Sequence, residues 1–131
     1  LAGTLLLTCN IGRAVEYRLL EESQALLNSD VVSVPHHGSA SSSSSVFLDH
    51  VAPRYAFLSV GKNNRYGHPK AAVVERYRQR GATLLRSDQL GAVQLIYRDH
   101  SWFGPYCARK QRRHFWERQT DTSQCIGPLK N

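Results

Sequence analysis

The sequence contains no methionine, no long apolar run and only three cysteines. No methionine occurs among its 131 residues. The first seven residues are mostly apolar, which is typical of the start of a buried strand, and they lack the basic flank of a signal peptide. We therefore expect a fragment whose upstream part is missing. No apolar run approaches the roughly 18 to 20 residues of a membrane span, which excludes a spanning helix in this piece.

The three cysteines, Cys9, Cys107 and Cys125, have neither an even number nor zinc-finger spacing. They do not make a disulfide framework. A single bridge between Cys107 and Cys125 stays open for an oxidising compartment, so the redox compartment is undecided at this point.

Acidic residues are scarce beside basic ones: ten Asp or Glu stand against 17 Lys or Arg, and the formal net charge is +7. Residues 98–131 alone hold seven basic and three acidic residues. A basic surface suits a polyanion, because neutralised phosphates release counterions. A solvated tail explains the same charge, and both interpretations stay open. The length and the 41% of hydrophobic residues are typical of one globular domain.

Apolar periodicity and turn residues predict a chain that alternates between strands and helices. The expected strands cover residues 4–8, 31–34, 55–60, 83–86 and 92–97, and the expected helices cover 13–27, 45–52 and 70–80. The first helix has an apolar face made of Val15, Leu19, Leu20 and Leu26. A serine of the tract 39–45 is a natural N-cap for the second helix, and Gly81 suits the end of the third. This order predicts helices layered on a sheet.

The segment VPHHGS places His36 and His37 just past a predicted strand, with Gly38 permitting close backbone approach. Metal-dependent hydrolases often carry ligands in such loops, because a rigid sheet fixes the geometry. His68 precedes Pro69 at a predicted helix N-terminus, where an anion such as a phosphodiester is favoured. From spacing alone, a hydrogen-bonded turn is the simpler explanation of the pair. A loop-closing hydrogen bond explains His68 as well as a ligand contact does.

Three longer motifs are more specific: PHHGS, SVGxxNxYGHP and SDxxGAV. With the LLLT strand they closely resemble the C-terminal metallo-β-lactamase-like domain of ComEC, the DNA-uptake channel protein of bacterial competence, over residues 4–97. The resemblance implies an α/β (α+β) fold: the C-terminal half of an αββα sandwich, with one mixed sheet and helices packed on it. It also implies that a first half with an HxDxDH ligand motif lies upstream.

The resemblance further implies a site. His36 and His37 would be catalytic and metal-ligating, one holding the metal and the other contacting substrate phosphate or an orienting carboxylate. Asn10, after Cys9, occupies the position of a metal-binding aspartate in the family. A neutral amide cannot bridge two divalent ions as a carboxylate can, so we expect Mn²⁺ or Zn²⁺ to bind weakly or not at all. The substrate-binding residues would be Ser39, Asn64, Tyr66 and His68.

Beyond residue 97 the apolar periodicity fades, and basic residues alternate with aromatic ones, namely Trp102, Phe103, Tyr106, Phe115 and Trp116. This mixture is expected where single-stranded bases stack, and equally in an amphipathic helix that docks on its own domain. We favour docking, because large aromatic side chains would otherwise be exposed. We therefore divide the chain into residues 1–97 and a basic aromatic tail or closing helix, 98–131. Asp88 is expected to shape a turn, and the histidines expected at the surface are His50, His100 and His114.

Two functions follow. The intact domain would hydrolyse phosphodiesters of incoming DNA with metal-activated water, and this piece would be inactive alone. Alternatively, as Asn10 favours, a degenerate, non-catalytic module would bind DNA or pack against the membrane channel. Either would be a soluble domain of a bacterial inner-membrane protein, with DNA and the upstream transmembrane part as partners and no small-molecule cofactor. Without its upstream half, the sheet should expose part of an apolar face.

Overall fold

The computed structural model describes residues 3–111, 121–127 and 129–130. Four short strands form a parallel sheet in the order of the sequence: β1 (Leu5–Leu6), β2 (Val31–Ser33), β3 (Tyr55–Leu58) and β4 (Thr83–Arg86). The connections are helical: α1 (Arg13–Ser23), η1 (Gln24–Leu26), η2 (Pro35–Gly38), α2 (Ser45–Val51) and α3 (Ala71–Gln79). The predicted alternation of strands and helices, and with it the α/β (α+β) class, is confirmed.

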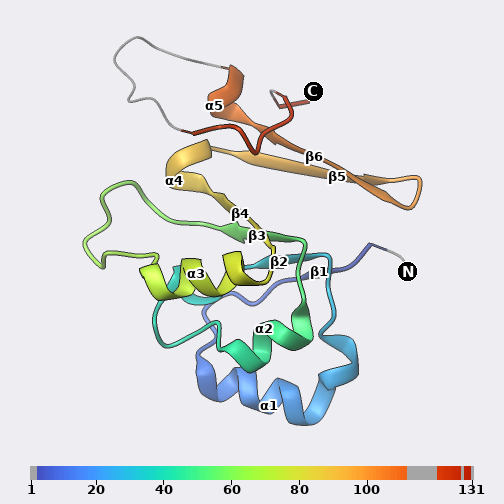
Figure 1. The fold of residues 1–131 in the computed structure, drawn as a ribbon, viewed down its shortest axis with the longest axis vertical. Helices are drawn as coiled ribbons and strands as arrows, with labels where there is room; N and C mark the ends of the chain where they lie inside the picture. Colours follow the sequence, from blue (N-terminus) through green and yellow to red (C-terminus); the bar gives the residue numbers. More distant parts are fainter. Residues whose placement is uncertain (1–2, 112–120, 128, 131) are drawn as a thin grey trace.

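An antiparallel hairpin follows the parallel sheet. This part of the chain consists of α4 (Ser87–Leu90), β5 (Val93–Arg98), β6 (Ser101–Cys107) and α5 (Ala108–Gln111). Figure 1 shows the hairpin over one face of the parallel sheet and helices α1 to α3 over the other. The protein therefore has three layers, made of helices, parallel sheet and hairpin. No helix in the described part of the chain is long and apolar enough to cross a membrane.

Alternating side chains of the central strands build a core on each face of the parallel sheet. Val32 and Ala56 lie in the core shared with the helices. Their neighbours Val31 and Tyr55 lie in the core shared with the hairpin. Successive residues of a strand point to opposite faces, so each central strand serves both cores and reads as a continuous apolar run.

Helix α2 begins where the serine tract predicts. Ser44 is its N-cap, and the Ser44 hydroxyl accepts a hydrogen bond from the Phe47 N–H at 3.4 Å. The helix ends at Val51, and its C-cap Ala52 has a left-handed φ of 46°. The predicted capping by a serine of the tract is therefore confirmed.

The buried face of α1 differs from the predicted one. Val15 and Leu26, both expected on the apolar face, are 40% and 80% exposed, whereas Glu16 is fully buried. Leu19 and Leu20 do pack against the core. Glu16 stands three and four residues before these leucines, so it shares their face of the helix. That spacing was the available signal for its burial.

Where a tail or closing helix was expected from residue 98, the described residues contain the end of β5 and then strand β6. The strand contains Gly104 and Pro105, which normally interrupt a strand and so conceal its pattern in the sequence. A register shift between Gln94 and Ile96 on β5 accommodates them. The boundary predicted at 97/98 therefore crosses the hairpin, and the single mixed sheet predicted is two separate sheets. The predicted roles of His114, Phe115 and Trp116 lie outside the described residues.

A disulfide joins Cys107 to Cys125, which decides the pairing that the sequence left open. Both cysteines are buried in the core between the hairpin and the parallel sheet. Next to the bridge, the Ile126 N–H donates to Pro105 O at 2.8 Å, so this C-terminal segment runs along β6. Cys9 is the free cysteine and is exposed.

The sheet face that was expected to be partly exposed is covered by the hairpin. Val31 and Tyr55, which point to that face, are 1% and 7% exposed. The prediction is therefore wrong for the central strands, because β5 and β6 supply the second layer from within the chain. Exposed apolar surface remains at the edge strand β1, where Leu5 is 52% exposed, and just beyond it at Leu7.

Candidate functional site

The loops that follow the first three parallel strands meet at one edge of the sheet. Because the strands are parallel, their carboxyl ends lie at the same edge, which is where open α/β sheets bind ligands. The turn Cys9–Asn10 follows β1, the histidine pair follows β2, and the loop 59–68 follows β3. The first two loops are joined directly, since the His36 N–H donates to Cys9 O at 2.9 Å.

The histidine pair has an unusual backbone. His36 (φ 49°, ψ 40°) and His37 (φ 55°, ψ 25°) are both left-handed, and Gly38 follows at φ 78°. Each non-glycine residue in this region costs about 1 kcal/mol or more, so neighbouring contacts must hold the turn. One such contact is the hydrogen bond from the Lys70 N–H to Gly38 O, 2.9 Å long. Backbone strain of this kind clusters at functional sites, which makes the turn a candidate.

His37 is oriented by the backbone at the end of β3. Its Nδ1 lies 2.7 Å from Ser59 O. A carbonyl oxygen only accepts, so Nδ1 carries the proton in this contact and Nε2 of the neutral ring keeps its lone pair. Metal-binding histidines commonly have the second ring nitrogen fixed by such a partner. His37 is therefore oriented to offer Nε2 as a ligand or a proton acceptor.

Asn64 closes the loop that carries His68. Its side-chain oxygen accepts from the His68 N–H at 2.9 Å, and its amide donates to His68 O at 2.7 Å and to Gly61 O at 3.1 Å. The side chain therefore shapes the loop. Its predicted contact with substrate stays a prediction.

His68 has a buried ring nitrogen, Nδ1, for which the described residues supply no hydrogen-bond partner. Tyr66 stacks on its ring with centroids 5.9 Å apart, and the His36 ring meets it edge-on at 6.4 Å. Desolvation lowers the pKa of His68 from its usual 6.5, and the neighbouring Lys70, His36 and His37 act in the same direction. These surroundings favour the neutral form of His68, in which a ring nitrogen has a lone pair for a proton or a metal.

A cavity of about 210 Å³ opens between these loops. Its lining consists of His37, Ser59, Val60, Gly61, Asn64, Tyr66 and His68. Three of the four residues predicted to bind substrate therefore meet at one cavity, together with one predicted catalytic histidine. Ser39, the fourth, lies outside this lining, and its hydroxyl is 3.0 Å from the Ser41 hydroxyl.

Asn10 lies exposed in the turn after β1, next to Cys9, which is also exposed and has a left-handed φ of 47°. Within the ranges that the structure describes, no three His, Cys, Asp or Glu side chains are grouped so that they could hold a metal ion. The cavity offers imidazole donors, which suit Zn²⁺ and similar ions but make only part of a ligand set. Metal binding by His36, His37 and Asn10 stays a prediction.

Glu16 organises the serine tract, and this role was not predicted from the sequence. Its fully buried carboxylate accepts hydrogen bonds from the N–H groups of Ser43 and Ser44. The Ser42 hydroxyl in turn donates to Pro35 O at 2.9 Å. Through the tract, α1 is linked to the turn that carries the histidines.

Helix α3 holds the serine tract from its other side. The Arg76 guanidinium donates to Ser42 O and Ser43 O at 3.2 and 2.9 Å. The Tyr77 hydroxyl lies 3.2 Å from the Ser43 hydroxyl, and burial raises the pKa of Tyr77 far above its usual value, so it stays protonated. These serine hydroxyls therefore order a loop.

Asp88 makes contacts within its own turn, in line with the turn-shaping role expected for it. Its carboxylate pairs with Arg86 at 2.8 Å, and it lies in α4, the short helix that leads towards β5. His100 is exposed in the hairpin turn, whereas His50 is half-buried on α2 with Nδ1 2.8 Å from Val46 O.

Comparison with known proteins finds similarity to two competence proteins. The chain is 44% identical over 92 residues to Competence protein ComA of Neisseria gonorrhoeae, covering 70% of this chain and 13% of that protein. It is 37% identical over 84 residues to ComE operon protein 3 of Bacillus subtilis, covering 61% of this chain and 11% of that protein. These matches support a fragment of a ComEC-family competence protein.

A third relative is Uncharacterized protein YcaI of Escherichia coli, 26% identical over 100 residues, which cover 76% of this chain and 13% of that protein. The chain thus spans only 11% to 13% of the length of the curated relatives it matches. No family model and no solved structure matches the chain. The metallo-β-lactamase-like fold therefore stays a prediction.

Proposed function

We propose that the chain is the C-terminal part of a ComEC-like metallo-β-lactamase-like domain, which in the intact inner-membrane protein hydrolyses DNA phosphodiesters during DNA uptake. Similarity to two competence proteins supports the biological process. The layering of helices, parallel sheet and second sheet is compatible with three consecutive layers of an αββα sandwich.

One observation carries the hydrolytic part of the proposal: histidines from two separate loops converge at the carboxyl edge of the parallel sheet. His37 and His68 line one cavity, and the His36 ring contacts the His68 ring. A buried polar atom normally has a partner, yet Nδ1 of His68 has none within the described ranges. A metal ion or a donor from the upstream half would supply it.

The residues present would have distinct tasks in such a site. His37 would offer Nε2 to Mn²⁺ or Zn²⁺, while His36 and His68 would line the position of the phosphate, and further ligands would come from upstream. The metal, when bound, would supply an activated water and neutralise developing negative charge. Tyr66 would shield the His68 ring from water on the side where it stacks.

A second candidate function, a degenerate module that binds DNA or packs on the channel without catalysis, is favoured by the turn after β1. Asn10 and Cys9 stand there, so this turn lacks the carboxylate that could bridge two ions. The described ranges also contain no group of three potential ligands. This alternative keeps the same partners and loses the hydrolysis.

Calorimetric titration of Mn²⁺ and Zn²⁺ into the folded chain tests the proposal. The parent is compared with Asn10→Asp, with the double variant His36→Ala, His37→Ala, and with His100→Ala, which removes an exposed histidine in the hairpin turn. We expect binding, weak in the parent and stronger in Asn10→Asp, that the double variant abolishes and that His100→Ala leaves unchanged. A Cys9→Ser variant distinguishes zinc bound by the exposed thiol from zinc bound at the histidines.

Two results would contradict the hydrolytic proposal. Binding that survives the double variant would place the metal elsewhere. Binding absent from the parent and from Asn10→Asp, both in the isolated chain and after an upstream half is restored, would favour the non-catalytic module.

A further inference from the structure

One face of the β5–β6 hairpin packs on the parallel sheet and the other does not. Residues paired across an antiparallel ladder share a face. Val93, Leu95 and Trp102 pack into the core beneath the hairpin, so the alternating pairs point outward. We name this surface the outer face. It consists of the pairs Gln94 with Tyr106, Ile96 with Phe103 and Arg98 with Ser101, together with Lys130.

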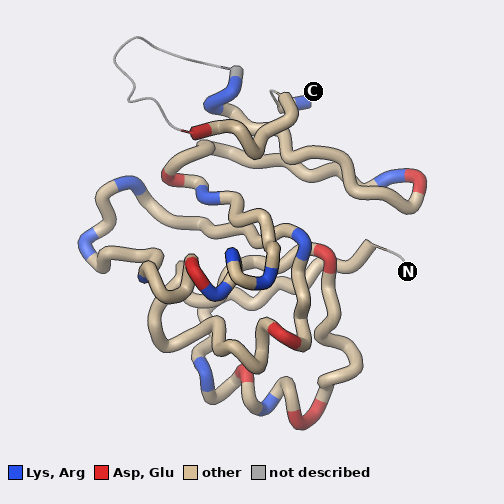
Figure 2. Tube along the Cα trace, viewed as in Figure 1, with Lys and Arg blue, Asp and Glu red and all other residues tan. Residues whose placement is uncertain are grey.

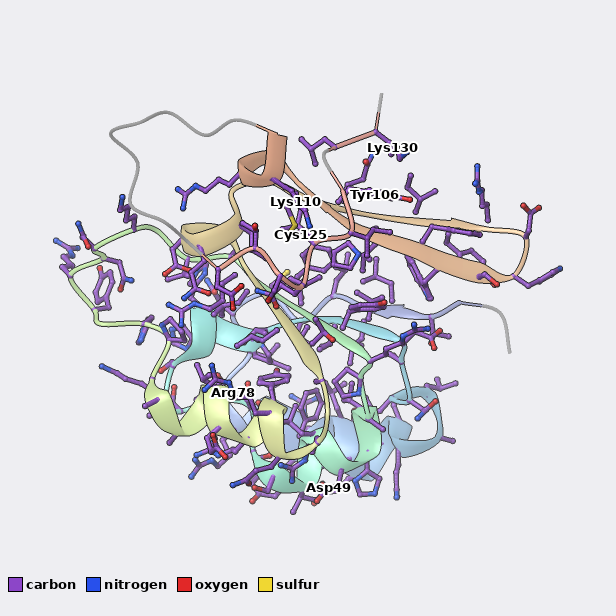
Figure 3. The ribbon with its side chains drawn as sticks, turned by 45° about the horizontal axis from the view of Figure 1, so that its top comes forward. Asp49, Arg78, Tyr106, Lys110, Cys125 and Lys130 are labelled. Atoms are coloured by element: carbon purple, nitrogen blue, oxygen red, sulfur yellow. A yellow bond between two sulfur atoms is a disulfide. The ribbon has the colours of Figure 1, made fainter. Side chains whose placement is uncertain are left out.

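Each aromatic ring of the outer face has a cation above it. The guanidinium carbon of Arg98 lies 4.7 Å from the Phe103 ring centroid, and the Lys130 ammonium nitrogen lies 5.2 Å from the Tyr106 ring centroid. Both rings are only half-buried. Figure 3 shows Tyr106 and Lys130 together beside the hairpin. The face therefore combines flat rings with positive charge.

Lys130 is held in place by the hairpin. The Gln94 side chain bonds to its backbone twice, accepting from its N–H at 2.9 Å and donating to its carbonyl at 3.2 Å. Closer to β6, the Cys107 N–H donates to Gly127 O at 3.0 Å, beside the disulfide to Cys125. The C-terminal cation is thus a fixed part of the outer face.

The charge of the outer face and of the whole chain favours an anionic partner. None of the seven residues that define the face is acidic, and Asp99 lies beyond it in the hairpin turn. The formal net charge is +7. Figure 2 shows basic positions in the hairpin layer as well as in the helical layer. A polyanion would therefore be attracted towards the hairpin layer as well as towards the helical layer.

Single-stranded nucleic acid matches both features of the outer face. Its bases stack on aromatic rings and on guanidinium planes, while Arg and Lys neutralise its phosphates. A duplex keeps its base faces inside the stack. An apolar protein surface would desolvate Arg98 and Lys130 without supplying an opposite charge.

We propose that the outer face binds single-stranded nucleic acid, with bases stacked on Phe103, Tyr106 and the Arg98 guanidinium and with phosphates on Arg98 and Lys130. This site is separate from the histidine cavity and does not rest on the hydrolysis proposed above.

Fluorescence anisotropy in EDTA tests this site without metal-dependent chemistry. The probe is a labelled thymidine oligomer of about 20 nucleotides, long enough for several stacking contacts, compared with a duplex of equal length. We expect tighter binding of the single strand, and about tenfold weaker binding by Phe103→Leu and by Tyr106→Leu, which keep apolar volume but lose the flat ring. Arg98→Gln and Lys130→Gln should weaken binding and reduce its salt dependence.

Arg18→Gln is the matched control, because it removes the same charge from an exposed position on α1, in the layer opposite the hairpin. Equal weakening by Arg18→Gln and Arg98→Gln would mean that overall charge alone sets the affinity, and would overturn the proposal. Unchanged affinity in the folded aromatic variants, or equal affinity for duplex, would overturn the stacking. Arg98 is exposed, so its variant remains a test if an aromatic variant fails to fold. Failure here would leave the metal-binding test of the histidines unaffected.

Discussion

The left-handed turn that carries the two histidines is fixed by the residue that follows them. Gly38 has φ 78°, and a Cβ built on it would lie 2.6 Å from Pro69 Cβ. The turn after β2 therefore packs directly against the segment that follows His68. This contact, with the hydrogen bond from Lys70 to Gly38 O, brings the two histidine loops together.

Gly38→Ala should destabilise the protein by roughly 2 to 4 kcal/mol, because it adds left-handed strain to an overlap with Pro69. Denaturant unfolding measures this loss. Two other glycines allow the cost of the left-handed backbone to be measured apart from the cost of the overlap with Pro69. Gly81, at φ 71° with no atom near its added Cβ, should cost only about 1 kcal/mol on change to alanine. Gly61 has neither constraint, so Gly61→Ala should be close to neutral. Equal effects at Gly38 and Gly81 would contradict the packing argument.

At the scale of the element, the serine tract is a loop whose backbone bonds are satisfied by neighbouring helices. Glu16 on α1 accepts two of its N–H groups, and Arg76 on α3 donates to two of its carbonyls. Buried loops are stable only when their polar groups are paired in this way. The tract can therefore cross the helical layer and still support the histidine turn.

Glu16→Gln should lower the free energy of unfolding by roughly 2 kcal/mol, because the amide keeps one acceptor oxygen and turns a donor towards the second serine N–H. Chemical denaturation measures the change. Glu21→Gln, an exposed position on the same helix, is the control and should have little effect. If the two variants lose the same stability, the buried carboxylate does not organise the tract.

At the scale of the whole molecule, the hairpin completes a second core that the parallel sheet cannot close alone. Cys107 and Cys125 lie in that core and bridge positions 18 residues apart in the sequence. The bridge joins β6 to the C-terminal segment, which also carries Lys130 to the outer face. Stability and the proposed nucleic-acid surface therefore depend on the same covalent connection.

Cys125→Ser should reduce stability by about 3 kcal/mol, the value expected for opening a loop of this length in the unfolded chain. Thermal unfolding with and without dithiothreitol measures it. In the parent, reduction should lower the midpoint, and in Cys125→Ser it should change nothing. Cys9→Ser, at the exposed free cysteine, should behave like the parent. A reductant effect of equal size in Cys125→Ser would argue against this bridge.

The sequence by itself determined the elements whose signals are local. The runs at residues 31–34 and 83–86 and the capping serine before α2 required only strand patterns and cap chemistry. The same local reasoning placed His36 and His37 just past a strand and His68 at a helix N-terminus. That these residues share one site was implied only by the family resemblance, because local patterns do not show that the strands are parallel.

Only the tertiary structure decided the features that depend on contacts between distant segments. Helical spacing places Glu16 on the same face as Leu19 and Leu20, but the partners that make its burial possible come from the serine tract 27 residues later. The strand character of β6 is concealed by Gly104 and Pro105 and appears only when β5 is beside it. The pairing of Cys107 with Cys125, and the covering of the sheet by the hairpin, likewise follow from how the layers stack. Local propensity carries no information about which distant surface a segment will meet, and packing against that surface determines burial, pairing and the shape of the site.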